Sequence, residues 1–312
     1  MRQSIDAHEI FAIVNPVAGG GRGYRAWRAI RPALRTAGRS VEEAVAQHER
    51  QAWELAEQAA RDGRDIVLAV GGDGTIHEVI NGLLRGRPER TPALAVIPGG
   101  TANIFVRALG LPRDPDAAAR LLLSGGRRRI DVGQVNDRYY ATIAGVGFDA
   151  EVVYRARRWP RWLGGKVRHV GAALRTLAFY RAVAARVRID EQEQVVPLYF
   201  LAAANTNWYG VGINVAPHAR IDDGRLSVVY VTDVGRLEVF GVLLQTFTGK
   251  HLGHRKVGHA FAREIHVESD VLLPVHADGE PVGRTPATFR CVPGALEVIV
   301  PHSTGQPERG GS

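Results

Sequence analysis

The sequence has little of several residue types, and each shortage excludes a class of protein. A single cysteine, Cys291, excludes an internal disulfide framework and a cysteine-rich zinc module. No run of about 18 apolar residues occurs, and acids and a histidine stand near the start where a signal peptide needs an apolar stretch. We therefore expect a cytoplasmic protein without a membrane-spanning helix. The 312 residues are 45% hydrophobic, which is too apolar for a disordered chain and enough for one large domain or two ordinary ones.

Lysine is also scarce, and the positive charge is unevenly distributed. Only three of the 40 basic residues are lysines, and the formal net charge is +8. Residues 155–188 hold ten Arg or Lys and no Asp or Glu, so the rest of the chain sums to −2. Such a segment either meets an anionic partner, a nucleic acid or a membrane surface, or is simply a solvated face.

The first third of the chain repeats one pattern three times. An apolar run, at 10–14, 66–70 and 94–97, leads each time into a glycine-rich turn and then a segment with helical spacing of apolar residues. This pattern is typical of parallel strands joined by crossover helices, with the loops at the carboxyl ends of the strands. We predict an α/β domain over residues 1–132.

From about residue 131 the pattern changes to short strands rich in Val, Tyr and Ile. Asp-Gly and Pro-Gly turns separate several of them, which predicts a mainly antiparallel second domain over 133–290. Two helical segments interrupt it, one through the basic stretch and one around 237–252. The polar tail over 304–312 is expected to fray.

The motif Gly71-Gly72-Asp73-Gly74-Thr75 follows an apolar run and precedes a helical segment. Glycines permit positive φ and let backbone amides approach phosphate oxygens, while the helix N-terminus adds partial positive charge. Asp73 would repel phosphate unless a divalent cation intervenes, which indicates Mg²⁺ bridged to a nucleotide phosphate. The alternative is a structural turn with a capping Asp. Equivalent loops at Asn15-Pro16 and Gly99-Gly100-Thr101 favour the nucleotide site.

No P-loop of the form G-x-x-x-x-G-K-[ST] is present, so phosphate binding must depend on amides, hydroxyls and arginine.

Several motifs occur in a fixed order along the chain. They are GGDGTIHEVINGL (71–83), PGGTANIFVRALGLP (98–112), AGVGFDAEV (144–152), the DDG-containing segment 216–226 and HADGE (276–280). From about Ile10 to Pro301 the chain resembles bacterial lipid kinases of the diacylglycerol kinase catalytic-domain family. The resemblance implies an α/β nucleotide-binding domain related to those of NAD kinases and phosphofructokinases, and a β-sandwich-like domain with a lipid site. It also implies that a last strand, at 291–303, returns to the first domain.

The same resemblance implies a reaction and the residues that perform it. The γ-phosphoryl group of ATP passes to a lipid hydroxyl, first of all that of diacylglycerol, with Mg²⁺ present. Asp73 positions the Mg-nucleotide and Glu280 acts as general base, taking the proton of the attacking hydroxyl. Without the resemblance, Asp278-Gly279-Glu280 would be an ordinary hairpin turn. The implied nucleotide site comprises Asn15, Gly71, Gly72, Asp73, Gly74, Thr75, Ile76, His77, Gly99, Gly100, Thr101 and Asn103.

Two further acidic positions are implied as metal sites. Asp222-Asp223-Gly224 has the form of a β-turn, but similar kinases hold a structural Mg²⁺ there, which implies the Asp223 side chain with the carbonyls of Arg220 and Arg225. Asp131 would join a catalytic Mg²⁺ network. Many relatives read Gly-Thr-x-Asn-Asp where this chain has Ile104, so Asp73 and Asp131 are the carboxylates left for that network.

The basic stretch mixes cations with indole rings. Tryptophan favours the headgroup level of a bilayer, and each cation near an anionic surface is worth roughly 1 kcal/mol. This composition predicts peripheral contact with an anionic membrane; a solvated helix with partly buried tryptophans is the alternative. The predicted membrane residues are Arg157, Arg158, Trp159, Arg161, Trp162 and Lys166. A homodimer is compatible with the sequence.

Three other functions stay open. A sphingoid-base kinase shares nearly the same first-domain motifs. NAD kinase shares the GGDG turn, but that assignment does not explain the basic, tryptophan-containing stretch. A non-catalytic nucleotide- or nucleic-acid-binding protein would explain the basic stretch, but it would not explain an acid at each proposed site. Nucleic acid is therefore the less favoured partner.

Overall fold

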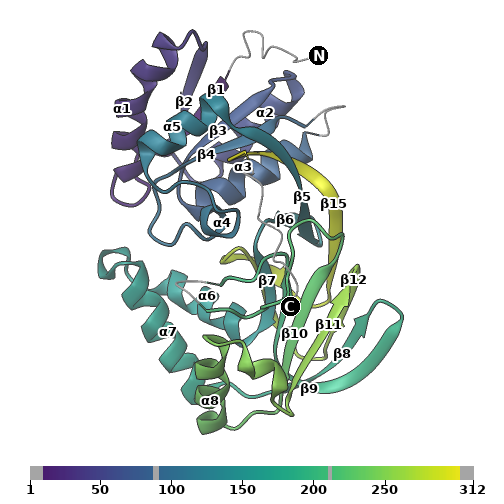
Figure 1. Cartoon of the computed structure of the whole chain (residues 1–312). Helices are drawn as coiled ribbons and strands as arrows, with labels where there is room; N and C mark the ends of the chain where they lie inside the picture. The colour runs from purple at the N-terminus through teal and green to yellow at the C-terminus, as the bar shows by residue number, and fades with distance from the viewer. Residues whose placement is uncertain (1–9, 87–90, 210–212, 303–312) are drawn as a thin grey trace, which may run out of the picture. The chain divides into compact units, whose positions relative to one another are not determined.

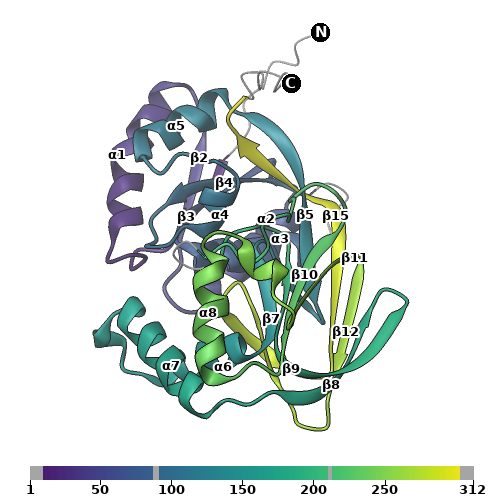
Figure 2. The same ribbon diagram turned by 60° about the horizontal axis from the view of Figure 1, so that its bottom comes forward.

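The computed structural model describes residues 10–86, 91–209 and 213–302, which form two compact units (Figures 1 and 2). The first unit comprises Met1–Arg129 and Glu297–Ser312, and the second Ile130–Leu296. Strands β5 (Gly126–Val135) and β15 (Ala287–Val300) each run through a boundary between the units. The predicted tail at 304–312 lies outside the described residues.

The first unit is built on a parallel sheet with the order β2-β1-β3-β4, to which the end of β15 adds through Val298 and Leu94. Its other elements are β1 (Ile10–Val14), α1 (Arg22–Thr36), β2 (Val41–Val45), α2 (Gln51–Arg61), β3 (Ile66–Gly71), α3 (Asp73–Arg85), β4 (Ala93–Pro98), α4 (Ile104–Ala108) and α5 (Pro115–Ser124).

Strands β1, β3 and β4 are buried on both faces, which is why they are continuous apolar runs, whereas the edge strand β2 is only partly buried and carries two glutamates. Trp27, Ile30 and Leu34 of α1 pack with Ala118 and Leu122 of α5 on one face. Helices α2 and α3 pack together on the other (Figure 1). The glycine-rich turns therefore follow the carboxyl ends of β1, β3 and β4, at one edge of the sheet.

The second unit is mainly antiparallel. Its strands have the order β14-β13-β7-β9-β8-β12-β15, and β10 and β11 extend the sheet from β9. Its elements are β6 (Arg138–Tyr140), β7 (Ile143–Gly147), α6 (Phe148–Arg158), η1 (Arg161–Leu163), α7 (Gly165–Phe179), β8 (Val183–Ile189), β9 (Gln192–Ala204), β10 (Leu226–Thr232), α8 (Arg236–Thr246), η2 (Lys250–Gly253), β11 (Val257–Ala262), β12 (Glu264–Glu268), β13 (Pro274–Ala277) and β14 (Glu280–Arg284).

Alternate residues of the central strands face two separate apolar cores. Along β9, Leu201 and Ala203 face the core shared with β12 and β15, while Ala202 and Ala204 face the core that includes Val242 of α8. A strand covered on both faces has little freedom to move. Strand β7 pairs with β9 and with β13 in this sheet, so the residues at the ends of β7 and β13 that form part of the candidate site are held in place.

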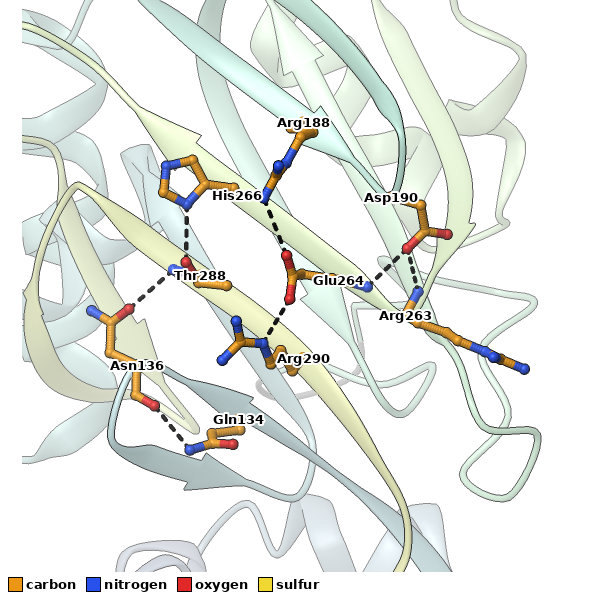
Figure 3. Close-up of polar contacts among 9 residues, drawn as sticks. All are labelled: Gln134, Asn136, Arg188, Asp190, Arg263, Glu264, His266, Thr288 and Arg290. Carbon is orange, nitrogen blue, oxygen red and sulfur yellow. Dashed lines mark hydrogen bonds and ion pairs between the residues drawn. The ribbon is translucent and has the colours of Figure 1, made fainter.

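The outward face of the second sheet carries a ladder of ion pairs (Figure 3). Glu264 of β12 accepts from Arg290 of β15 at 2.7 Å and from Arg188 of β8 at 3.2 Å. Each exposed pair of this kind contributes roughly 0.2–1 kcal/mol. The ladder therefore supports strand register.

The predicted combination of a parallel α/β part and a mainly antiparallel part is confirmed. One local expectation was incomplete, because the helix predicted through the basic stretch is two helices, α6 and α7. Pro160 and Gly164, whose φ is 73°, separate the two helices. Within the described residues, no helix combines the length and hydropathy needed to cross a bilayer.

Candidate active site

Three glycine-rich loops of the first unit meet at backbone distance. A Cβ built on Gly99 would lie 2.5 Å from the Cα of Gly23 and 3.5 Å from that of Gly71. A Cβ on Gly72 would lie 3.0 Å from the Cα of Gly100. The loops that follow β1, β3 and β4 therefore pack main chain against main chain, and the parallel topology brings together the predicted loops.

The glycines of these loops serve two different purposes. Gly19, Gly20 and Gly21, in the loop after β1, have positive φ values of 56°, 71° and 79°, a conformation that favours glycine. Gly71 and Gly99 are not in that region; instead a Cβ would collide, in the case of Gly71 with Thr75 Oγ1 at 2.4 Å. The positive φ expected at the GGDGT motif is therefore not found, and close approach explains the glycines at Gly71 and Gly72.

Asn15 and Thr75 connect two of these loops directly. The Asn15 side-chain amide donates to Thr75 Oγ1 at 3.0 Å, and Asn15 Oδ1 accepts from the amide of Val17. Thr75 does not cap α3, whose N-cap is Gly72. The side chains of Ile76 and His77 are buried, so they pack within the unit.

Asp73 organises the neighbouring loop. Its Oδ1 accepts from the amide of Ile104 at 2.7 Å and from that of Phe105 at 3.3 Å, at the start of α4. Asn103, with φ 48°, precedes this helix and donates to the carbonyl of Gly100 at 3.1 Å. Asp73 therefore positions the Gly100–Asn103 loop, a role that the sequence reasoning did not assign to it. Ile104, where relatives have Asp, contributes its amide to this contact.

In the second unit, Glu280 begins β14, directly after the tight turn of the β13–β14 hairpin. Asp278 and Gly279 form the turn with φ values of 50° and 81°. The Asp278 carboxylate accepts from the amides of Ala141 and Thr142 at 2.9 Å each and from Thr142 Oγ1 at 2.5 Å. These bonds fix the turn to the chain before β7, so the backbone that carries Glu280 is held in one conformation.

A buried pair, Asp149 and His276, holds the same hairpin from the other side. His276 Nε2 lies 2.6 Å from Asp149 Oδ2, and the Gly279 amide donates to Nδ1 at 3.3 Å. Because Nδ1 accepts, Nε2 carries the proton and donates to the carboxylate. A Cβ on Gly145 would lie 2.1 Å from Asp149 Oδ2, so glycine is required there. Burial and the Asp149 charge raise the pKa of the adjacent Tyr209 well above its usual value.

The structure also joins two residues that the sequence placed in separate roles. Arg157 of α6, a predicted membrane residue, pairs with Glu280 at 2.6 Å between Nη2 and Oε2. Both side chains are partly exposed, at 52% and 34%, so the pair is open to solvent and to a ligand. The candidate base therefore has a cationic neighbour that can exchange partners.

Asp131 is buried, and its carboxylate fastens two loops. Oδ2 accepts from the amide of Gly224 at 2.6 Å and Oδ1 from that of Gly294 at 2.8 Å. In the adjacent turn, Asp223 Oδ1 accepts from the amide of Arg225 at 3.1 Å, and Arg220 lies 3.9 Å from Asp222. No cluster of three His, Cys, Asp or Glu side chains suited to a metal ion occurs in the described part of the chain.

The predicted membrane residues lie on α6, η1 and the start of α7. Arg157 and Arg158 are exposed, Trp162 is 83% exposed, and Trp159 is half-buried. The side chains of Arg161 and Lys166 are outside the described set. A hollow of about 380 Å³ lies beside them, lined by Trp159, Val167, Val170, Gly171 and Leu174. Gly171 makes room for the Trp159 ring, since a Cβ there would lie 2.4 Å from it.

An α/β unit with converging glycine loops, followed by a β-sandwich-like unit with a fixed acidic hairpin, defines a two-part kinase. The family model described as "Diacylglycerol kinase catalytic domain" matches residues 9–135, and "YegS C-terminal NAD kinase beta sandwich-like domain" matches 142–300. The chain belongs to the diacylglycerol kinase catalytic-domain family and is a lipid kinase enzyme. This confirms the family and the sandwich-like second unit that the sequence predicted.

Individual relatives agree with that assignment. A diacylglycerol kinase of Mycobacterium tuberculosis is 32% identical over 300 residues, covering 94% of this chain and 95% of the relative. A protein of Chromohalobacter salexigens described as "Probable lipid kinase YegS-like" is 34% identical over 251 residues, covering 80% of each chain. A crystal structure of a diacylglycerol kinase from Bacillus anthracis str. Sterne, 23% identical, shares the fold with a TM-score of 0.74 over 97% of this chain and all (100%) of the other.

The Asp149–His276 pair was not predicted from the sequence, although both residues lie in motifs of the family. Gly145, four residues before Asp149, is consistent with a close contact at that point. The residue that Asp149 contacts, His276, lies 127 residues further along the chain, so the pair itself could not be identified. Arg22 was also missed. Its guanidinium contacts two of the glycine loops, and nothing in its local sequence separates it from the other arginines of α1.

Proposed function

We propose that this lipid kinase transfers the γ-phosphoryl group of ATP to the hydroxyl of diacylglycerol. The observation that carries the proposal is the convergence of the three glycine loops, which presents main-chain amides and the N-terminus of α3 at one edge of the parallel sheet. The first intrahelical bond of α3 is that from Ile76 to Gly72 at 3.0 Å, so the amides before it point out of the helix. Such amides suit phosphate oxygens.

Mg²⁺ is expected to accompany the nucleotide, and the residues present suit it. Asn103 Oδ1 is buried without a hydrogen-bond partner in the described structure, beside the loop that Asp73 holds. A buried oxygen of this kind is stabilised by a cation, or by a water molecule bound to a cation. Mg²⁺ prefers carboxylate, amide and water oxygens. Asp73 and Asn103 are thus the side chains proposed to hold it, directly or through water. When bound, Mg²⁺ would neutralise phosphate charge.

Glu280 is proposed as the residue that takes the proton of the lipid hydroxyl. Its carboxylate is partly exposed on a hairpin that Asp278 and His276 fix in place. A positioned carboxylate within hydrogen-bond reach of the acceptor removes its proton as the oxygen attacks phosphorus. Asp131 and the 220–225 turn are proposed to support the second unit, where Asp223 with the Arg220 and Arg225 carbonyls remains the proposed site of a structural cation.

A lipid panel tests the substrate. Wild-type protein with radiolabelled ATP and Mg²⁺ should label diacylglycerol faster than sphingosine, ceramide or NAD, since the relatives at 30% identity or more include diacylglycerol kinases. Asp73→Asn is the inactive comparison, because Asn keeps an oxygen for the Ile104 amide but loses the charge. It should label diacylglycerol far less than wild type. Preferential labelling of sphingosine or of NAD would transfer the assignment to those kinases, and labelling of nothing would favour a binding protein.

We further propose that the enzyme reaches its lipid by peripheral contact of α6, η1 and α7 with an anionic membrane. Residues of α7 that would form an ordinary core are instead open, with Val167 at 55%, Val170 at 61% and Leu174 at 57% exposure. Apolar side chains next to exposed arginines and tryptophan match the headgroup region of a charged bilayer. A fully solvated helix would not need that apolar face.

Vesicle cosedimentation tests this contact. Binding to vesicles with anionic lipid should exceed binding to neutral vesicles, and Arg158→Gln should weaken the anionic binding about fivefold, as expected for one cation near the surface. Trp162→Ala should weaken the binding to anionic vesicles more than Arg158→Gln does. Arg186→Gln, an exposed arginine of β8 in the same basic stretch, is the control and should bind like wild type. Equal binding to both vesicle types, or to neither, would contradict electrostatic docking.

A further inference from the structure

Arg22, the first residue of α1, lies across two of the glycine loops. Its Nε donates to the carbonyl of Gly19 at 3.0 Å, and its Nη2 donates to the carbonyl of Gly100 at 3.2 Å and to Thr101 Oγ1 at 3.3 Å. The residue is exposed, so these bonds form at the surface of the loops. The Arg22 guanidinium therefore lies beside the glycine-rich loops that are proposed to bind the nucleotide phosphates, which we call the phosphate cradle.

The charge balance of the cradle makes this position significant. The three lysines of the chain, Lys166, Lys250 and Lys256, all belong to the second unit, so the first unit has no lysine for the nucleotide phosphates. Backbone amides and a helix N-terminus provide only partial charges. A phosphoryl transfer site ordinarily adds a full cation that stabilises charge on the transferred group.

We propose that Arg22 is a phosphate ligand of the nucleotide site, an inference that rests on ATP being the phosphoryl donor. In the free enzyme its guanidinium is held by two carbonyls and a hydroxyl. When the triphosphate is bound, one or more of these neutral bonds give way to bonds with β- or γ-phosphoryl oxygens. The exchange is favourable because hydrogen bonds between two charged groups are roughly twice as strong as neutral ones, and the planar fork can contact two oxygens.

A purely structural Arg22 would tie the Gly19 and Gly100 loops together and nothing more. The two roles differ in their dependence on phosphate number. Loss of a tether would weaken AMP, ADP and ATP alike, because the whole cradle would loosen. Loss of a ligand to the outer phosphates would weaken ATP most and leave AMP almost unchanged.

The experiment is calorimetric titration of ATP, ADP and AMP into wild type, Arg22→Gln and Arg22→Lys, with thermal melts to confirm folding. We expect Arg22→Gln to weaken ATP about 10- to 150-fold, as for one lost hydrogen bond between charged groups, and AMP less than twofold. Arg22→Lys keeps the charge without the fork and should fall between. Arg28→Gln, an exposed arginine of the same helix, is the control and should match wild type.

Each outcome decides one proposal. Equal weakening of the three nucleotides, or no weakening of ATP in either variant, would overturn the role of Arg22 while leaving ATP as the donor. A wild-type protein that binds no adenine nucleotide would overturn the proposed donor, and the role of Arg22 with it. If Arg22→Gln does not fold, the ATP-to-AMP ratio of Arg22→Lys decides.

Discussion

Replacement of Glu280 by Gln is expected to reduce phosphoryl transfer by about 10²- to 10⁴-fold, the usual contribution of a positioned general base. Gln has nearly the same size as Glu and can still accept from Arg157, so the hairpin should stay in place. What it loses is the ability to take a proton from the lipid hydroxyl. The effect should therefore fall on kcat with little change in the affinity for ATP, whose proposed ligands lie in the other unit.

The measurement is turnover of radiolabelled ATP with diacylglycerol in detergent micelles, which removes any dependence on membrane docking. Glu193→Gln is the matched control, because Glu193 is an exposed glutamate of the same unit that pairs with Arg186 at 3.5 Å. Its turnover should equal that of wild type. If Glu280→Gln turns over as fast as Glu193→Gln, Glu280 is an ordinary member of a surface ion pair and another group takes the proton.

Much of the first unit could be predicted because its signals are local. Apolar runs followed by glycine turns specify parallel strands, and parallel strands end at the same edge of the sheet, so the meeting of the three loops follows from the pattern. The reason for the glycines was less accessible. The contact of Gly99 with Gly23 depends on how closely the loop after β4 approaches the first turn of α1, which no local pattern encodes.

The polar connections of the site were hidden for a related reason. Asp73 contacts amides 31 and 32 residues away, and Asp149 contacts His276 across 127 residues. Such contacts depend on the register between strands and on the direction of each side chain, so a motif can identify the residues without showing what they touch. Arg157 illustrates this limit. Composition assigned it to a membrane surface, and the fold also places it beside Glu280.

Asp131→Ala is expected to lower the thermal stability of the protein. Asp131 is only 4% exposed, and its two carboxylate oxygens accept from the amides of Gly224 and Gly294. Alanine would leave both amides without their acceptor, and a fully buried group left unpaired costs about 1–3 kcal/mol, which is an upper value for these part-buried amides. For a protein of this size each kcal/mol lowers the Tm by roughly 2–4 °C, so a fall on the order of 10 °C is expected.

Thermal melts with Mg²⁺ and with a chelator separate this structural role from the metal network that the sequence suggested. Because the carboxylate already contacts two amides, the loss of stability should be the same under both conditions. Asp131→Asn keeps one acceptor oxygen but turns an NH2 donor toward the other amide, so it should lose at least half as much. Asp137→Ala removes an exposed aspartate near Arg138 and should change the free energy of unfolding by less than about 0.5 kcal/mol. A loss that appears only with Mg²⁺ would instead connect Asp131 to a bound cation, either as a ligand or through the 220–225 turn, where a structural cation is proposed and whose Gly224 amide it holds.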